Sequence, residues 1–195
     1  MRDSIALDST RLQRLQQISL WDFALSLYAK PGVEAACLSL QDEAEVDVCE
    51  LLFHCWLYTC GLEVVPVAVV PLRQERRQWQ HRVTDVLREL RRDLKASAAS
   101  SSSIAALRET IKQAELLAER ENLQRWQTWI FDMPITDQYV RNIGEIKPNA
   151  AIWLRKQLFM TDAEKLTKGD MKRPEKTLHA LQTLASQLDP YLGAR

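Results

Sequence analysis

The sequence predicts an all-α protein, and three observations support this fold class. The 195 residues include only 5 glycines and 7 prolines, too few for the many tight turns of an all-β protein. Good helix formers such as Ala, Leu, Gln, Glu and Arg are frequent instead. Apolar residues recur at helical spacing through most of the chain. We therefore expect a compact three-helix N-terminal unit packed on a long antiparallel helical hairpin, followed by a small helical C-terminal region.

Capping signals define the first helices of the N-terminal unit. Ser19 and Asp22 have the spacing of a capping box, which predicts a helix over residues 20–29. Pro31-Gly32 ends that helix, and apolar spacing predicts a second one over residues 33–41.

A second capping pair predicts where the third helix begins. Asp42 is followed three residues later by Glu45, so we expect this helix to start there and to run to about Cys60. Gly61 suits the position just past its end. Residues 64–70 are β-branched and apolar but interrupted by proline, which indicates an extended, buried connector rather than a regular strand.

Two long amphipathic helices are expected next. The first covers about residues 71–96, and the second covers about residues 104–130. The Ala- and Ser-rich run 96–103 between them predicts a solvated loop, and so short a loop makes the helices antiparallel. The first apolar stripe consists of Trp79, Val83, Val86, Leu87, Leu90 and Leu94, and the second of Leu107, Ile111, Ala114, Leu117, Leu123 and Trp126.

Met133-Pro134 interrupts the helical pattern and suggests a boundary between a domain over residues 1–133 and a C-terminal extension over residues 134–195. Three shorter helices are expected in the extension, over residues 136–142, 148–159 and 174–188. A further capping box spans residues 161–164, and residues 189–195 resemble a tail.

Charge is balanced globally but not locally. The 26 basic and 26 acidic residues cancel, which weakens any argument from net charge for nucleic acid or an anionic membrane as partner. Residues 31–72 hold seven acids and no Lys or Arg, whereas residues 73–95 hold eight Lys or Arg and four acids, a net charge of +4. We therefore expect an acidic N-terminal face and a basic helix.

The sequence predicts a cytoplasmic protein. The longest apolar stretch, residues 62–72, is far shorter than the ~20 residues of a membrane-spanning helix. The first residues lack the apolar core of a secretory signal. Thiols are therefore expected at the four cysteines, whose spacing favours core packing over a metal site: Cys37, Cys49, Cys55 and Cys60.

Several short motifs occur in a fixed order in the N-terminal unit. They are Trp21–Tyr28, Pro31–Leu38, Leu40–Asp42 and Asp47–Phe53, followed by Trp56-Leu57. In these motifs the chain resembles a bacterial family known as domain of unknown function 2390, and the usual length of that family implies coverage to about residue 133. The resemblance implies no reaction, substrate or cofactor. Related sequences tend to have glycine within the segment 43–45, where this chain has Glu-Ala-Glu.

Four polar residues are candidates for a pocket between the N-terminal helices: Asp22, Tyr28, Glu50 and His54. Asp22 lies between aromatic residues, where a buried carboxylate can acquire a raised pKa, although its capping role already explains it. Asp47, Glu50 and His54 lie along one side of a helix, a spacing that suits a divalent ion or a proton relay. A solvated helix face has the same spacing, and with one histidine there we expect neither metal nor cofactor.

Five arginines form the candidate partner-binding stripe of the basic helix: Arg76, Arg77, Arg88, Arg91 and Arg92. They lead us to expect a non-enzymatic, cytoplasmic interaction or regulatory module that binds a protein partner. The first alternative is a small-ligand-binding protein or enzyme that uses the candidate pocket. The second is a nucleic-acid-associated protein, in which these arginines follow a phosphate backbone and Trp126 and Trp129 stack on bases.

Overall fold

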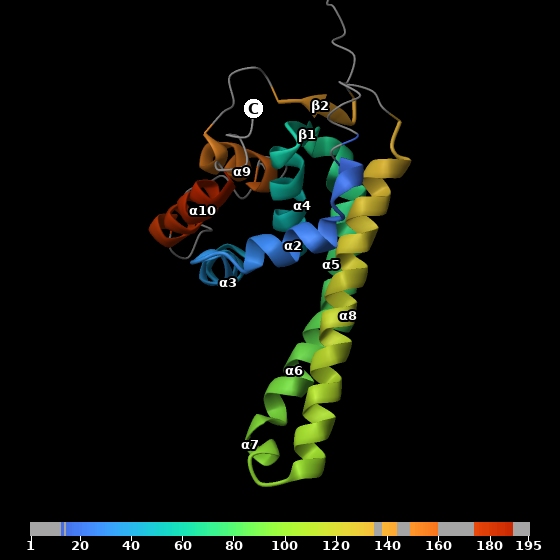
Figure 1. The fold of residues 1–195 in the computed structure, drawn as a ribbon, viewed down its shortest axis with the longest axis vertical. Coiled ribbons are helices and arrows are strands. Elements are labelled where there is room, and N and C mark those ends of the chain that lie inside the picture. Colours follow the sequence, from blue (N-terminus) through green and yellow to red (C-terminus); the bar gives the residue numbers. More distant parts are fainter. Residues whose placement is uncertain (1–12, 14, 135–137, 144–148, 160–173, 189–195) are drawn as a thin grey trace, which may run out of the picture.

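The computed structural model describes residues 13, 15–134, 138–143, 149–159 and 174–188. It shows a helical head from which one long antiparallel hairpin projects (Figure 1). Within the described residues the fold is all-α apart from one two-stranded sheet, which confirms the predicted fold class. We refer to the projecting part of the hairpin, residues 82–121, as the arm.

The first helices of the head form as predicted. Helix α2 spans Leu20–Tyr28, and the Ser19 side chain accepts a hydrogen bond from the backbone N–H of Asp22 at 3.1 Å. Helix α3 spans Val33–Ala44 and begins after Gly32, which has a φ of 80°. The capping box and the Pro-Gly break thus act where the sequence places them.

The predicted start of the third helix at Asp42 is wrong. Helix α3 continues through this position, and Glu45 ends it in the left-handed conformation with a φ of 53°. Helix α4 then spans Val48–Thr59, and its N-cap is Asp47, whose Oδ1 accepts hydrogen bonds from the backbone N–H groups of Cys49 (2.8 Å) and Glu50 (3.3 Å). Two acids five residues apart both suit an N-cap, and tertiary packing selects the second.

A small sheet replaces two of the predicted features. Strand β1, Leu62–Val64, pairs antiparallel with strand β2, Val140–Asn142, and a 3₁₀ turn, η1, follows at Pro66–Val69. The connector over residues 64–70 is therefore mostly a 3₁₀ turn, and the helix predicted over residues 136–142 is wrong. The pairing partner of β2 lies far back in the sequence, so local spacing does not reveal this strand.

The first long helix of the hairpin is interrupted. Helix α5 spans Val70–Trp79, a π-helical turn, η2, spans Gln80–Thr84, and helix α6 spans Asp85–Asp93. Part of the predicted loop forms the short helix α7, Lys95–Ala98, and the return helix α8 spans Ser102–Asp132. Among the described residues, no helix has the length and apolarity needed to cross a membrane.

The C-terminal helices pack on the head. Helix α9 spans Ala150–Phe159 and contacts α4, and helix α10 spans Pro174–Leu188 and contacts α3 and α9. Both were expected. Residues on the two sides of Met133 belong to one hydrophobic core, while the domain boundary itself stays a prediction. The capping box at 161–164 and the tail at 189–195 lie outside the described residues.

Aromatic residues and thiols fill the core of the head. Trp56 and Trp126 are fully buried, and the rings of Phe53 and Trp126 lie 4.9 Å apart. Trp56 Nε1 donates a hydrogen bond to the backbone oxygen of Ile18 at 3.2 Å. The four cysteines are buried thiols, as the sequence predicts.

Candidate functional site

The four pocket candidates lie in different environments. Asp22 is exposed at the start of α2, where its carboxylate accepts a hydrogen bond from the Ser19 hydroxyl at 2.6 Å. Tyr28 is half-buried at the end of α2, and burial raises its pKa to about 12, with Cys37 and Glu34 adding to the effect. Only Glu50 and His54 lie together, both buried in the head.

Glu50 and His54 belong to a buried ionic cluster. Arg73 Nε donates to Glu50 Oε1 at 2.7 Å, and His54 Nε2 lies 3.5 Å from the same oxygen. Burial alone would raise the pKa of the Glu50 carboxyl, but the neighbouring His54 and Arg73 outweigh burial and lower it. Arg73 also donates to the backbone oxygen of Gln157 at 3.3 Å, so the cluster links α4, α5 and α9. All three side chains are almost fully buried.

The suggested row of Asp47, Glu50 and His54 does not act as one group. Asp47 caps α4, whereas Glu50 pairs with Arg73. Within the part of the chain that the structure describes, no cluster of three or more His, Cys, Asp or Glu residues is arranged to hold a metal ion.

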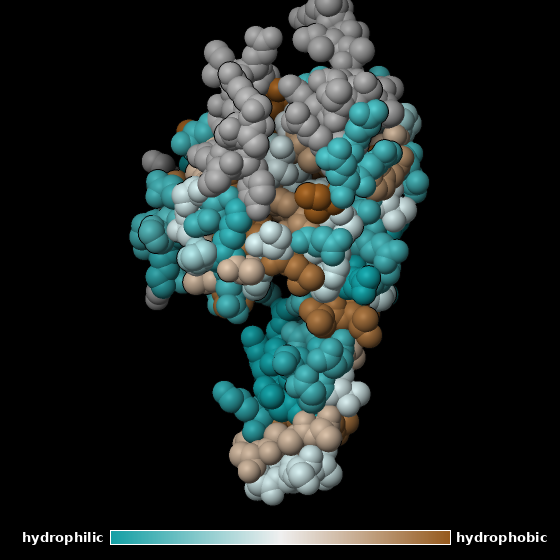
Figure 2. Space-filling model, in the orientation of Figure 1, coloured by the Kyte–Doolittle hydropathy of each residue, from teal (hydrophilic) through white to brown (hydrophobic). Residues whose placement is uncertain are grey.

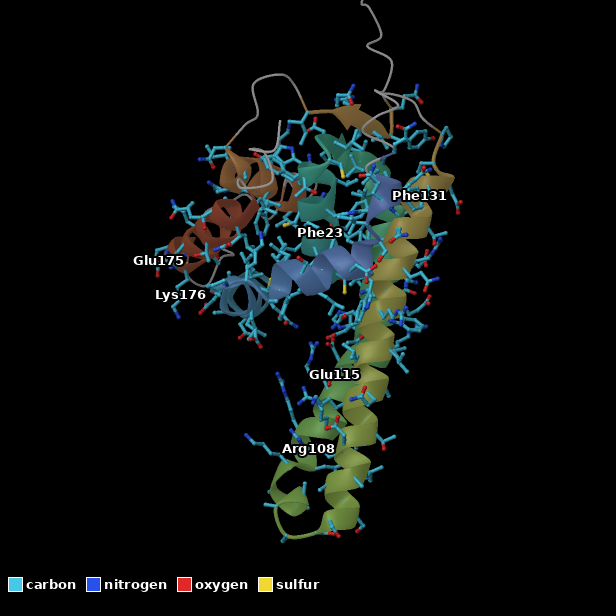
Figure 3. All side chains as sticks on the ribbon, in the orientation of Figure 1. Phe23, Arg108, Glu115, Phe131, Glu175 and Lys176 are labelled. Carbon is cyan, nitrogen blue, oxygen red and sulfur yellow. The ribbon has the colours of Figure 1, made fainter. Side chains whose placement is uncertain are left out.

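Two of the candidate partner-binding arginines hold the arm together. Arg88 donates to Glu115 at 3.0 Å and to Glu119 at 2.9 Å, and Arg91 Nε donates to Glu115 Oε2 at 2.5 Å. We call these residues, Arg88, Arg91, Glu115 and Glu119, the ion-pair ladder. Arg108 extends it by donating to the backbone oxygen of Arg91 at 3.2 Å. Figure 3 labels Arg108 and Glu115 on the arm, and Figure 2 shows hydrophilic residues over the middle of the arm in this view, with hydrophobic residues at its base and less polar ones at its tip.

The other three arginines differ in exposure. Arg76 is buried, its guanidinium lies 5.6 Å from the Trp79 ring centroid, and it donates to Glu75 at 2.6 Å. Arg77 and Arg92 are exposed. The five arginines therefore do not form one continuous exposed stripe.

A different surface of the arm is unexpectedly apolar. Four aliphatic side chains are exposed there: Val86 (54 %), Leu90 (46 %), Leu107 (51 %) and Leu117 (64 %). We call these four residues the apolar arm face. All four belong to the predicted apolar stripes of the two amphipathic helices.

Helix geometry places the apolar arm face opposite the ion-pair ladder. At about 3.6 residues per turn, Val86 and Leu90 lie on one flank of the α6–α8 seam, and Arg88 and Arg91 lie on the other. On α8, Leu107 and Leu117 lie on the flank opposite Glu115 and Glu119. Because the two helices are antiparallel and share one seam, each broad side of the arm combines one flank of each helix. One side carries the ion-pair ladder, and the other carries the four exposed aliphatic side chains.

A shallow hollow adjoins the base of the apolar arm face. It has a volume of about 220 Å³ and is lined by Glu75, Arg76, Gln78, Trp79, Arg82 and Val83, around the π-helical turn. Arg125 of α8 donates to Glu75 at 3.0 and 3.2 Å. By helical spacing Arg125 shares its flank of α8 with Leu107, so the hollow opens on the apolar side of the arm.

Comparison with family models identifies the segment that carries these features. A model described as a protein of unknown function, DUF2390, matches residues 19–126, more than half of the chain. The chain belongs to the DUF2390 family. Comparisons with curated proteins and with solved structures gave no significant match.

The DUF2390 segment covers helices α2 to α7 and most of α8. It agrees with the resemblance found in the sequence, both in the family and roughly in its extent. The ion-pair ladder, the apolar arm face and the hollow all lie inside the DUF2390 match, whereas β2, α9 and α10 lie outside it. The segment assigned to DUF2390 thus includes the whole arm together with the helices that anchor it.

Proposed function

We propose that this DUF2390 protein is a non-enzymatic, cytoplasmic interaction module of bacterial origin that binds a protein partner through its arm. The observation that carries this proposal is the exposed apolar arm face. Exposed aliphatic side chains that share one side of a hairpin favour an interaction surface, because their contact with water is unfavourable.

The electrostatics of the arm support a protein rather than nucleic acid as the partner. Arg88 and Arg91 are engaged by Glu115 and Glu119 across the hairpin. These carboxylates neutralise the arginines, and their negative charge would oppose a phosphate backbone. The apolar arm face, in contrast, suits the apolar stripe of a partner helix, which is a common mode of helix recognition.

Site-specific photo-crosslinking tests the proposal. A photoreactive amino acid placed at Leu117 in the cellular protein is expected to yield a crosslinked protein band. The matched control is Leu116, an exposed neighbour (43 %) that points away from the apolar arm face. Crosslinks at position 117 but not at 116 support the module. Absence of a crosslink at 117, or equal crosslinking at both positions, overturns it.

A further inference from the structure

We infer that the occupant of the apolar arm face is the same face of a second copy of this chain, so that two arms form a four-helix bundle. This inference rests on the proposed function and names the partner. It starts from a packing requirement: a two-helix hairpin has one seam, so its broad sides stay open unless another layer covers them. Here one side carries the ion-pair ladder, where the Glu119 backbone oxygen accepts from Cys49 Sγ of the head at 3.9 Å, and the other presents four aliphatic side chains.

The dimensions of the arm suit such a dimer. Between its tip and the head, about 20 residues of α8 extend about 30 Å, and two helices side by side are about 20 Å wide. One broad side therefore offers ~600 Å² and two copies ~1,200 Å², the lower end of the range for specific protein interfaces. The hollow at the base of the face extends the contact toward the head.

Val86 and Leu117 are in register for a two-fold axis parallel to the hairpin. Arg88 contacts both Glu115 and Glu119, so residue 88 lies level with about residue 117 of the antiparallel helix. Val86 thus lies within about 3 Å of Leu117 along the axis. Rotation about the two-fold axis places α6 of one copy across α8 of the other, and Val86 then meets Leu117 of the second copy.

Opposite charges meet in the same arrangement. Arg82 lies one turn before Val86 and lines the hollow, and Glu121 lies one turn after Leu117. Both side chains are exposed. Because Val86 faces Leu117 of the second copy, Arg82 faces Glu121 of that copy, and symmetry forms this ion pair twice. Such pairs at the edge of an apolar contact fix its register.

The mass of the protein in solution tests the dimer. Light scattering of the full chain at about 100 μM is expected to give about 45 kDa, twice the chain mass of 22.5 kDa, because mass action favours the dimer at high concentration. Leu117→Glu is expected to weaken dimerisation at least ~10-fold by placing a charge in the contact. Leu116→Glu, with unchanged helicity in both variants, is expected to leave the dimer intact.

A monomeric wild-type protein at this concentration overturns the dimer. The proposed function would then still hold if the partner is a different protein. In that case the product crosslinked at position 117 would have a mass other than that of two copies of this chain. A dimer that survives Leu117→Glu also overturns the inference, because the copies then meet elsewhere.

Charge reversal tests the register. Arg82→Glu and Glu121→Arg are each expected to weaken the dimer several-fold, whereas the double variant restores wild-type dissociation because the ion pair re-forms with reversed polarity. Failure of the double variant to restore dimerisation overturns the two-fold arrangement described here.

Discussion

Glu45 ends α3 in a conformation that suits glycine better than glutamate. Its φ is 53°, and it is exposed at the surface of the head. A left-handed conformation costs a residue with a Cβ atom about 1–2 kcal/mol, whereas glycine adopts it freely. The resemblance noted in the sequence led us to expect glycine within this segment, where this chain has Glu-Ala-Glu.

We predict that Glu45→Gly stabilises the protein by about 0.5–1 kcal/mol, because relief of strain exceeds the extra entropy that glycine gives the unfolded chain. Urea denaturation measures the change. The matched control is Ala44→Gly, at the last residue of α3, which is expected to destabilise by up to about 1 kcal/mol. Loss of stability in both variants would show that the Glu45 conformation carries no strain.

Asp47 makes the stability of the head depend on pH. Burial raises the pKa of its carboxyl to about 6, the nearby Glu50 adds to the rise, and the backbone N–H groups of Glu50 and Cys49 oppose it. The buried side chain of Asn122, on α8 just beyond the arm, also lies beside it. Between about pH 4 and pH 6 the folded protein therefore holds a proton that the unfolded chain has lost, so this residue makes stability fall as pH rises through that window.

We predict that Asp47→Asn removes this contribution and retains the cap, since the asparagine oxygen still accepts the two backbone hydrogen bonds. The difference in unfolding free energy between variant and wild type should thus change between about pH 4 and pH 6, with the variant gaining relative stability as pH rises. Asp42→Asn, at an exposed position of α3, is the control. A difference for Asp47→Asn that is independent of pH would contradict the account.

At the scale of elements, the ion-pair ladder rather than a buried apolar stripe connects α6 to α8 in the arm. No described residue of α6 itself is buried, and Glu115 is the buried acid that both Arg88 and Arg91 contact. The charged groups on this side are partly shielded from solvent, so their pairing contributes more to stability than a typical exposed ion pair does.

We predict that the double variant Arg88→Glu/Arg91→Glu loosens the arm, because it places two further carboxylates beside Glu115. Hydrogen exchange of the amides in α6 and α7 should accelerate by about tenfold or more, while α4 in the head keeps its protection. Arg92→Glu, a change at an exposed site, should leave exchange in the arm as it is. Equal protection of α6 in the double variant and the wild type would mean that the ladder does not hold the helix.

Capping residues, prolines and apolar spacing correctly predicted the helices whose ends are set by neighbouring residues in the sequence. Helix α10 has the bounds expected from its proline start and apolar spacing, and Ser19 caps α2 as expected. Contacts between residues far apart in the sequence determine the elements that were not predicted. Strand β2 exists because it pairs with β1, and the start of α4 at Asp47 depends on packing that selects between two suitable caps.

At the scale of the whole molecule, the head and the arm differ in how far they bury their apolar side chains. The head buries Trp56, Trp126 and its ionic cluster, whereas the arm projects from the head as a hairpin (Figure 1) and exposes four aliphatic side chains. The sequence predicted a hairpin and an apolar stripe along it. It did not reveal that Val86 and Leu117 are exposed, because this depends on the position of the seam between α6 and α8 and on the π-helical turn before α6.

The candidate sites depend on contacts between different helices. Helical spacing placed Glu50 and His54 on neighbouring turns, and they lie together. It did not reveal Arg73, which reaches Glu50 from another helix, or the acids of α8 that engage Arg88 and Arg91. Pairing between helices far apart in sequence decided which charges remain available to a partner.

Thiol labelling at the arm tests most directly whether the apolar arm face is covered in the cell. Leu117→Cys and Leu116→Cys place single thiols on neighbouring positions, and the four native cysteines are buried. In the isolated chain, position 117 is the more exposed of the two, at 64 % against 43 %. We predict that a maleimide added to intact cells labels the Leu116→Cys variant rapidly and the Leu117→Cys variant slowly, because a partner covers position 117. Labelling of the Leu117→Cys variant at least as fast as that of the Leu116→Cys variant would contradict the claim that the arm binds through this face.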